Sequence, residues 1–288
     1  MRTPARLVAF GAGLAIVFAG AALAGGALDP LRDSGDAHGG GHGDDHSAAA
    51  PVAAGGHAPP GLAVADDDLR LVADTTTLPR AASTRWTFRI VDAHGDAVTD
   101  FDVEHEREMH LIVVRRDLSG YQHLHPRRDA DGTWRVDLRL PAAGVYRAYA
   151  DFSAGGRSST LATDLFVAGA FTPRALPSPT PVDEAGGYRA ELSAEGLEPG
   201  ASAAIAYDLS RDGRPLTAIE PYLGADGHLV ALREGDLAFL HVHPEESGTP
   251  GRIRFAAELP SAGRYRLFLQ FRHDGAVRTV AHTLEVSP

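Results

Sequence analysis

The chain is a tandem duplication of one unit. Residues 110–126 read HLIVVRRDLSGYQHLHP and residues 228–244 read HLVALREGDLAFLHVHP, so His, twelve residues, His, one residue and His-Pro recur without a gap. Farther along, LPAAGVYRAYADF at 140–152 matches LPSAGRYRLFLQF at 259–271. Self-similarity over such a distance is typical of a duplicated structural unit. Both copies should therefore share one fold, and the histidines are the polar pattern that both retain.

Short apolar or alternating runs, separated by turn-forming residues, make up each copy. Such runs predict strands, and no helical periodicity competes with them. About seven short strands in about 110 residues predict an all-β chain of two immunoglobulin-like or cupredoxin-like β-sandwich domains. The runs are 69–73, 86–91, 110–114, 121–125, 133–140, 145–152 and 160–167 in the first copy, and YRAEL, AAIAYDL, HLVAL, AFLHVH, IRFAAEL, YRLFLQF and TVAHTLEV in the second.

The domain boundaries follow from composition. We expect the first sandwich at 61–170 and the second at 185–288, because about 110 residues are enough for one hydrophobic core. The stretch between them, FTPRALPSPTPVDE at 171–184, is rich in proline and predicts a linker.

Residues 1–28 are predicted to be a targeting element. Arg2 and Arg6 precede an uncharged run at 7–28, in which ALA at 22–24 fits a signal-peptide cleavage pattern. The run is also long enough to remain as a transmembrane helix that anchors the chain. Both alternatives place the bulk of the chain outside the cytoplasm, either secreted or anchored in the membrane.

Residues 29–60 form a tether rich in His, Gly and Asp. Gly, Ala, Asp and Pro cannot build a hydrophobic core, so we expect the segment to be disordered. It carries four histidines that could capture divalent ions loosely, although a solubilising spacer with incidental histidines is the alternative. These weaker candidate ligands are His38, His42, His46 and His57.

Composition restricts the partners of the protein. The 288 residues carry 27 basic and 38 acidic side chains, a net charge of −11, and no cysteine. The negative charge argues against nucleic acid as a partner and suits metal cations. Without cysteine there is no disulfide, thiolate metal site or thiol catalysis.

The repeated histidines are predicted to converge on a hairpin. If residues 116–119 form a four-residue loop, His110 lies opposite His125, and His123 shares their face because strand side chains alternate. The second copy would repeat this geometry with residues 234–237 as the loop and His228 opposite His243. Three imidazoles suit Cu(II) or Zn(II) rather than Mg²⁺ or Ca²⁺. We therefore predict two metal sites, one made by His110, His123 and His125 and one by His228, His241 and His243.

Catalysis is not expected. HEREMH at 105–110 resembles the zinc-protease motif, but its histidines are five residues apart rather than four and the stretch is not helical. No acid or base beside the triad is common to both copies, which a catalytic metal site would need. His273 and His282 have no counterparts in the first copy and are expected at the surface, whereas Met109 is expected in the core.

Two long motifs resemble a known family. MHLIVVRRDLSGYQHLHP and EPYLGADGHLVALREGDLAFLHVHP, together with the His-rich tether and the N-terminal segment, are similar to extracytoplasmic proteins of high-GC Gram-positive bacteria. These proteins are labelled heavy-metal-associated or secreted and are often linked to copper-handling genes. The resemblance covers nearly the whole chain and implies metal handling, but it supplies no ligand residues.

These observations predict a protein that binds a divalent transition metal outside the cytoplasm, copper before zinc, for homeostasis or resistance. The alternative is a β-sandwich interaction module of the cell envelope, in which the histidines are structural and another envelope protein is the partner.

Overall fold

The computed structural model describes residues 59–240 and 242–288. These residues form strands and no helix, so the all-β prediction is confirmed. Within these ranges no helix is long and apolar enough to cross a membrane. The predicted targeting segment and almost all of the predicted tether lie outside the described residues, as do His38, His42, His46, His57 and His241.

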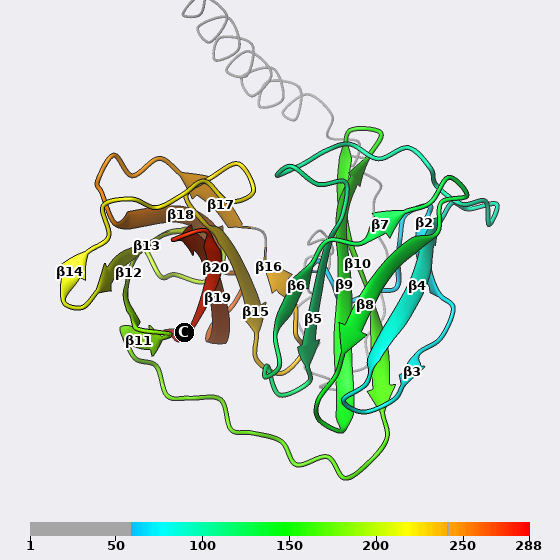
Figure 1. Ribbon diagram of the computed structural model, residues 1–288, viewed down its shortest axis with the longest axis horizontal. Helices are drawn as coiled ribbons and strands as arrows, with labels where there is room; N and C mark the ends of the chain where they lie inside the picture. Colours follow the sequence, from blue (N-terminus) through cyan, green and yellow to red (C-terminus); the bar gives the residue numbers. More distant parts are fainter. Residues whose placement is uncertain (1–58, 241) are drawn as a thin grey trace, which may run out of the picture. The chain divides into compact units, whose positions relative to one another are not determined.

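The first domain is a sandwich of two five-stranded sheets (Figure 1). One sheet has the order β1-β2-β4-β8-β7 and the other the order β3-β10-β9-β5-β6. The strands are β1 (Ala65–Asp66), β2 (Leu69–Ala73), β3 (Thr77–Leu78), β4 (Ser83–Val91), β5 (His110–Arg115), β6 (Gln122–Leu124), β7 (Arg127–Arg128), β8 (Trp134–Arg139), β9 (Gly144–Ala154) and β10 (Arg157–Val167).

The second domain repeats this arrangement. One sheet has the order β11-β12-β13-β18-β17, with β14 paired to β13, and the other has the order β16-β15-β19-β20. The strands are β11 (Val182–Ala185), β12 (Tyr188–Glu195), β13 (Ser202–Arg211), β14 (Arg214–Pro215), β15 (His228–Arg233), β16 (Phe239–Leu240), β17 (Val242–Glu245), β18 (Arg252–Glu258), β19 (Gly263–His273) and β20 (Ala276–Val286). Because β11 pairs with β12, the second domain begins within the stretch predicted as linker.

The sandwiches are immunoglobulin-like in strand order. Strands β2-β4-β8-β7 correspond to A-B-E-D and strands β10-β9-β5-β6 to G-F-C-C′. Each domain also has a tyrosine corner, a feature typical of this fold. The hydroxyl of Tyr146 donates to the Ala142 carbonyl (3.0 Å), and that of Tyr265 donates to the Ser261 carbonyl (2.7 Å).

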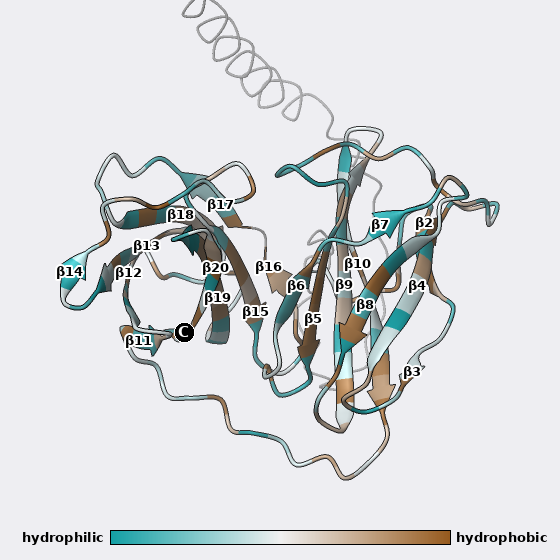
Figure 2. Ribbon diagram, in the orientation of Figure 1, coloured by the Kyte–Doolittle hydropathy of each residue, from teal (hydrophilic) through white to brown (hydrophobic). Residues whose placement is uncertain are grey.

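Strand β5 is buried on both of its faces. Leu111 and Val113 point into the core of the first domain, whereas Ile112 and Val114 point away from it. Strand alternation explains the division, and Figure 2 shows β5 as predominantly hydrophobic. A second apolar layer must therefore cover the outward face of β5.

The second domain provides that cover. A hydrophobic layer between the domains contains Ile112, Val114, Leu118, Tyr149 and Ala162 from the first and Val230, Leu232, Leu237, Phe239 and Phe268 from the second. Tyr121 stacks on Phe268 with ring centroids 4.1 Å apart, and Tyr149 packs against Phe239 at 5.5 Å. The Tyr149 hydroxyl also donates to the Leu237 carbonyl (2.7 Å). The duplicated faces therefore pack against each other through corresponding aromatic residues.

Truncating an aromatic residue of the interdomain layer should destabilise the whole protein. Phe268→Ala removes a buried ring and leaves a cavity, so we expect a loss of about 3 kcal/mol in the free energy of unfolding. Urea denaturation measures it. Phe166→Ala is the control, because Phe166 is 46% exposed and its truncation should cost far less. Equal losses in the two variants would contradict the interdomain layer.

Candidate metal centre

The two hairpins have the predicted register. In the first domain Leu111 pairs with Leu124 and Ile112 with His123. In the second domain Ala231 pairs with Leu240. A turn of fixed length determines which residues face each other across a hairpin. The same register continued by one pair would place His110 opposite His125.

The first predicted triad gathers on the outward face of the hairpin. His110 Nδ1 lies 3.0 Å from His123 Nε2. The ring of His125 lies 5.1 Å from that of His110 and 4.8 Å from that of His123, measured between centroids. His110 lies on the same strand face as Ile112 and Val114, at the end of the interdomain layer, and His123 and His125 lie beside it. They are therefore brought together at the boundary between the domains.

Of the second predicted triad, the structure describes His228 and His243, which lie in different surroundings. His228 lies against the first cluster, with its ring centroid 5.5 Å from that of His110 and 4.7 Å from that of His123. His243 is exposed on β17, which pairs with β18 of the opposite sheet. The cross-strand pairing predicted for His228 and His243 is therefore not present, since His243 pairs with Ala256. His241 lies outside the described residues.

An early strand crossing causes this difference between the copies. Strand β16, which pairs with β15, ends at Leu240. Strand β17 begins at Val242, which packs against the domain core, and it pairs with β18 of the other sheet. In the first domain the crossing comes later, because β7 begins at Arg127, beyond His125. The second copy thus contributes one described histidine, and the first contributes the others.

Three histidines offer ligand atoms close enough for one ion. The nitrogens of His110, His123 and His228 lie within 4.8 Å of one another. His125 is adjacent, and its Nε2 is buried without a hydrogen-bond partner. The candidate centre is therefore composite, with two ligands from the first domain and one from the second.

Hydrogen bonds select the tautomers of two of these histidines. His110 Nε2 donates to the Glu104 carbonyl (3.1 Å), which can only accept, so neutral His110 has its lone pair on Nδ1. His123 Nδ1 donates to Gln270 Oε1 (2.7 Å), which leaves a lone pair on Nε2. Gln270 Nε2 in turn donates to Thr279 Oγ1 (3.3 Å), consistent with this orientation of the amide. With these tautomers, two lone pairs face each other across 3.0 Å.

Burial keeps the cluster neutral. Desolvation, reinforced by the neighbouring histidines, lowers the pKa of His123 to about 3. It also lowers the pKa of His125 to about 4 and is the largest cause of the lowered pKa values of His110 and His228. For His110, the Glu104 carbonyl and Asp151 act in the opposite direction. Neutral imidazole is the form that binds metals.

A small cavity of about 40 Å³ reaches the cluster. Its lining includes His105, His110, Asp151 and His228. Neither His105, which belongs to the excluded protease-like motif, nor Asp151 was predicted from the sequence to be a ligand. Asp151 pairs with His110 across β5 and β9, and its carboxylate accepts from Thr160 Oγ1 (2.7 Å). The sequence alone could not identify Gln270, which contacts His123 from the other domain.

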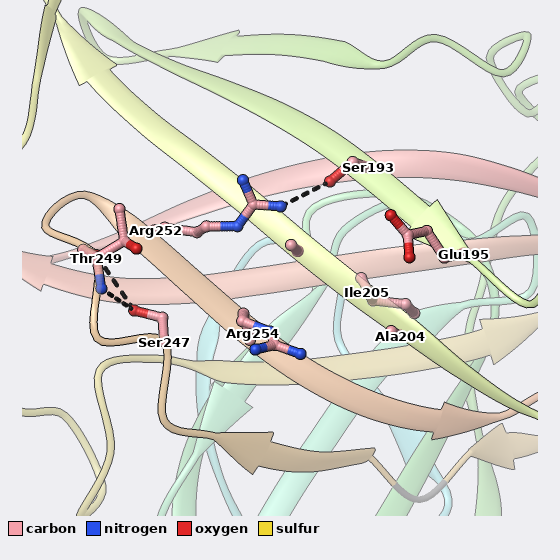
Figure 3. A pocket seen from close by; sticks show the side chains of 9 residues that line it. Ser193, Glu195, Ala204, Ile205, Ser247, Thr249, Arg252 and Arg254 are labelled. Carbon is pink, nitrogen blue, oxygen red and sulfur yellow. Dashed lines mark hydrogen bonds between the residues drawn. The ribbon is translucent and has the colours of Figure 1, made fainter.

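A larger hollow lies on the outer face of β12, β13 and β18 (Figure 3). Its volume is about 360 Å³, and its cations are already paired. Arg252 contacts Asp208 at 3.2 Å and Ser193 at 3.5 Å, and Arg254 contacts Glu245 at 3.3 Å. The positive charges of the hollow are therefore compensated within the domain, and its lining also includes the carboxylate of Glu195.

Two further histidines differ from the prediction that they lie at the surface. His282 is fully buried in the second core, where its ring meets that of Tyr207 with centroids 5.4 Å apart. His273 is partly buried, and its Nδ1 lies 3.0 Å from the Tyr188 hydroxyl. Met109 is buried in the first core, as predicted.

Acid should destabilise the metal-free protein through the histidine cluster. The folded-state pKa values of about 3 and about 4 lie below the ordinary value near 6.5. The unfolded chain therefore binds more protons below pH 6.5, and stability present above that pH is lost as pH falls toward 3. Each such histidine should contribute a slope of about 1.4 kcal/mol per pH unit in this window.

Urea denaturation in the presence of a chelator, between pH 7 and pH 5, measures that slope. His123→Gln should make it shallower, whereas His94→Gln, at an exposed turn, should not. Identical slopes for wild type and His123→Gln would show that His123 is not held neutral by the fold.

No curated protein sequence matches the chain. A DUF4426 family protein from Pseudomonas aeruginosa PAO1 has a TM-score of 0.29 and 11% identity, over 37% of this chain and 96% of that chain. The Escherichia coli adhesin FdeC has a TM-score of 0.27 and 15% identity, over 78% and 66%. Yersinia pseudotuberculosis InvD has a TM-score of 0.25 and 15% identity, over 76% and 57%. Such similarities do not carry a function across.

The family comparison matches both copies of the repeat. The model of a domain of unknown function, DUF8832, matches residues 63–169 and again residues 182–288. Together these ranges cover most of the chain and correspond to the two sandwiches. The protein therefore belongs to the DUF8832 family and contains two copies of its domain.

Proposed function

We propose that the protein binds one divalent transition-metal ion at His110, His123 and His228, copper in preference to zinc. The observation that carries the proposal is the 3.0 Å approach of His110 Nδ1 to His123 Nε2, where the tautomers set by Glu104 and Gln270 would place two lone pairs. Two acceptors at that distance repel each other unless a cation lies beside them. Because burial disfavours a proton there, a metal ion is the cation that suits the site.

The spacing of the ligands also fits a metal. Imidazole nitrogens bind Zn²⁺ or Cu²⁺ at about 2.0–2.1 Å, so two ligands of one ion lie about 3 to 4 Å apart. The three nitrogens lie within 4.8 Å of one another, so small rotations of the rings would complete the site. Three neutral imidazoles suit copper or zinc, whereas Mg²⁺ and Ca²⁺ require oxygen ligands.

The hydrogen bonds that orient the ligands support the same proposal. Histidines that bind metals generally donate their second N–H to a carbonyl or carboxylate, which sets the tautomer. His110 does so to the Glu104 carbonyl and His123 to the Gln270 amide oxygen. Binding rather than catalysis is the proposed activity.

We place this activity outside the cytoplasm, in metal homeostasis or resistance. The N-terminal run at 7–28 supports export, either by a cleaved signal peptide or by a retained anchor. The resemblance of the long histidine motifs to heavy-metal-associated secreted proteins supports metal handling. The histidines of the tether would add weak capture of ions near the domains. An envelope interaction module with structural histidines is the alternative that metal titration tests.

Metal titration of the full chain should show one tight site. The sample for this titration should carry no affinity tag and should have glutamine in place of the four tether histidines, His38, His42, His46 and His57. We expect one Cu(II) or Zn(II) per chain by calorimetry. His123→Gln and His228→Gln should each weaken binding about a hundredfold, because loss of a ligand costs more than loss of a partner that orients it. His94→Gln is the control.

Two results would contradict the composite site. Two equivalent ions per chain would favour separate sites in the two domains. Wild-type affinity in both ligand variants would remove the histidine cluster from metal binding and favour the interaction module.

Gln270 should act as a positioning residue for His123. Gln270→Leu removes the acceptor that holds the proton on Nδ1, so metal affinity should fall about tenfold. Gln270→Glu keeps an acceptor and should retain the affinity. Calorimetry gives both values, and circular dichroism confirms folding. If Gln270→Leu binds like wild type, the contact with Gln270 does not orient the ligand.

A further inference from the structure

A strained tight turn precedes the buried histidines of the first domain. Backbone hydrogen bonds join Glu104 N to the Arg107 carbonyl (2.9 Å) and Arg107 N to the Glu104 carbonyl (3.0 Å). The two central residues are left-handed, with φ of 47° at His105 and 65° at Glu106. Residues other than glycine adopt this conformation at a cost, and such residues concentrate at functional sites.

The second domain has the same turn with different residues. Tyr222 and Ala225 form the matching bridge, and the left-handed positions are Leu223 and Gly224. Glycine relieves the strain at one of the two positions there. The first domain instead carries a histidine and a glutamate in this conformation.

The turn places His105 between solvent and the buried cluster. His105 is exposed, yet its ring centroid lies 6.1 Å from that of His110 and 5.9 Å from that of His228. The same small cavity is lined by His105, His110, His228 and the carboxylate-bearing Asp151. A cation entering by this cavity would meet the exposed His105 before the partly buried His228 and the buried His110.

The turn is also connected directly to one of the ligands. The Glu104 carbonyl accepts from Arg107 N within the turn and from His110 Nε2 in β5. The Glu104 carboxylate accepts from the Ser158 hydroxyl (3.2 Å), so the turn is tied to β10 as well. Movement of the turn therefore alters the bond that sets the tautomer of His110.

We infer that His105 is the entry ligand of the proposed metal site, an inference that rests on the proposed function. The imidazole of His105 replaces one water of a hydrated Cu(II) or Zn(II) ion at the mouth of the cavity. Nitrogens of His228 and His110 then replace further waters, and His105 is released. Each step exchanges one neutral ligand for another, so no electron or proton is transferred.

Kinetics of metal uptake test this role in the full chain with the tether histidines replaced as above. His105→Asn removes the imidazole and keeps a residue that tolerates a left-handed backbone. His94→Asn is the matched control, also an exposed histidine in a turn of the first domain. Stopped-flow mixing with Zn(II) measures association, and transfer to a chromophoric chelator measures release.

We expect His105→Asn to slow association and release about tenfold each and to leave the dissociation constant nearly unchanged, since an entry ligand lowers a barrier that both directions cross. Rates equal to those of His94→Asn would overturn the inference. A tenfold weaker affinity at an unchanged association rate would also overturn it, because His105 would then be a permanent ligand. Wild-type protein that takes up no metal would instead defeat the proposed function itself.

Discussion

The structure depends on strands β5 and β15 being buried on both faces. Each strand contributes one set of side chains to its own sandwich and the other set to the layer between the domains. Paired aromatic contacts, Tyr121 with Phe268 and Tyr149 with Phe239, close this layer. Because His110 and His228 begin β5 and β15, the packing of the apolar residues also determines where the imidazoles lie.

The same packing gives the cluster its chemistry. The histidines are desolvated at the end of the apolar layer, and their pKa values fall because the charged form loses hydration. Buried polar atoms ordinarily find hydrogen-bond partners, yet His125 Nε2 has none, and the tautomers assigned to His110 and His123 would set two lone pairs against each other. A folded chain tolerates such an arrangement where a ligand supplies the missing interaction, as a metal ion would.

Local rules explain why much of the fold was predictable. Strand alternation and turn length gave the register of both hairpins, which Leu111–Leu124 and Ala231–Leu240 follow. The contribution of His228 to the first cluster was not predictable, because it depends on how two domains pack. Nor could the sequence show that pairing with β15 ends at Leu240 and that His243 lies on β17, which pairs with β18 of the other sheet. The burial of His282 follows from strand alternation, because it shares the face of Val280, Leu284 and Val286 in the core of its own domain.

The proposed single site, in place of the two predicted from the repeats, combines residues of both copies. One domain alone supplies His110 and His123, and the other adds His228 only when the outward faces of β5 and β15 meet. The ligand set therefore exists only in the packed pair of domains. Divergence then acted on the surroundings, with His105 and Glu106 in one turn and Leu223 and Gly224 in the other. Because the proposed ligands come from both domains, we expect the packing of the domains to control the affinity for metal.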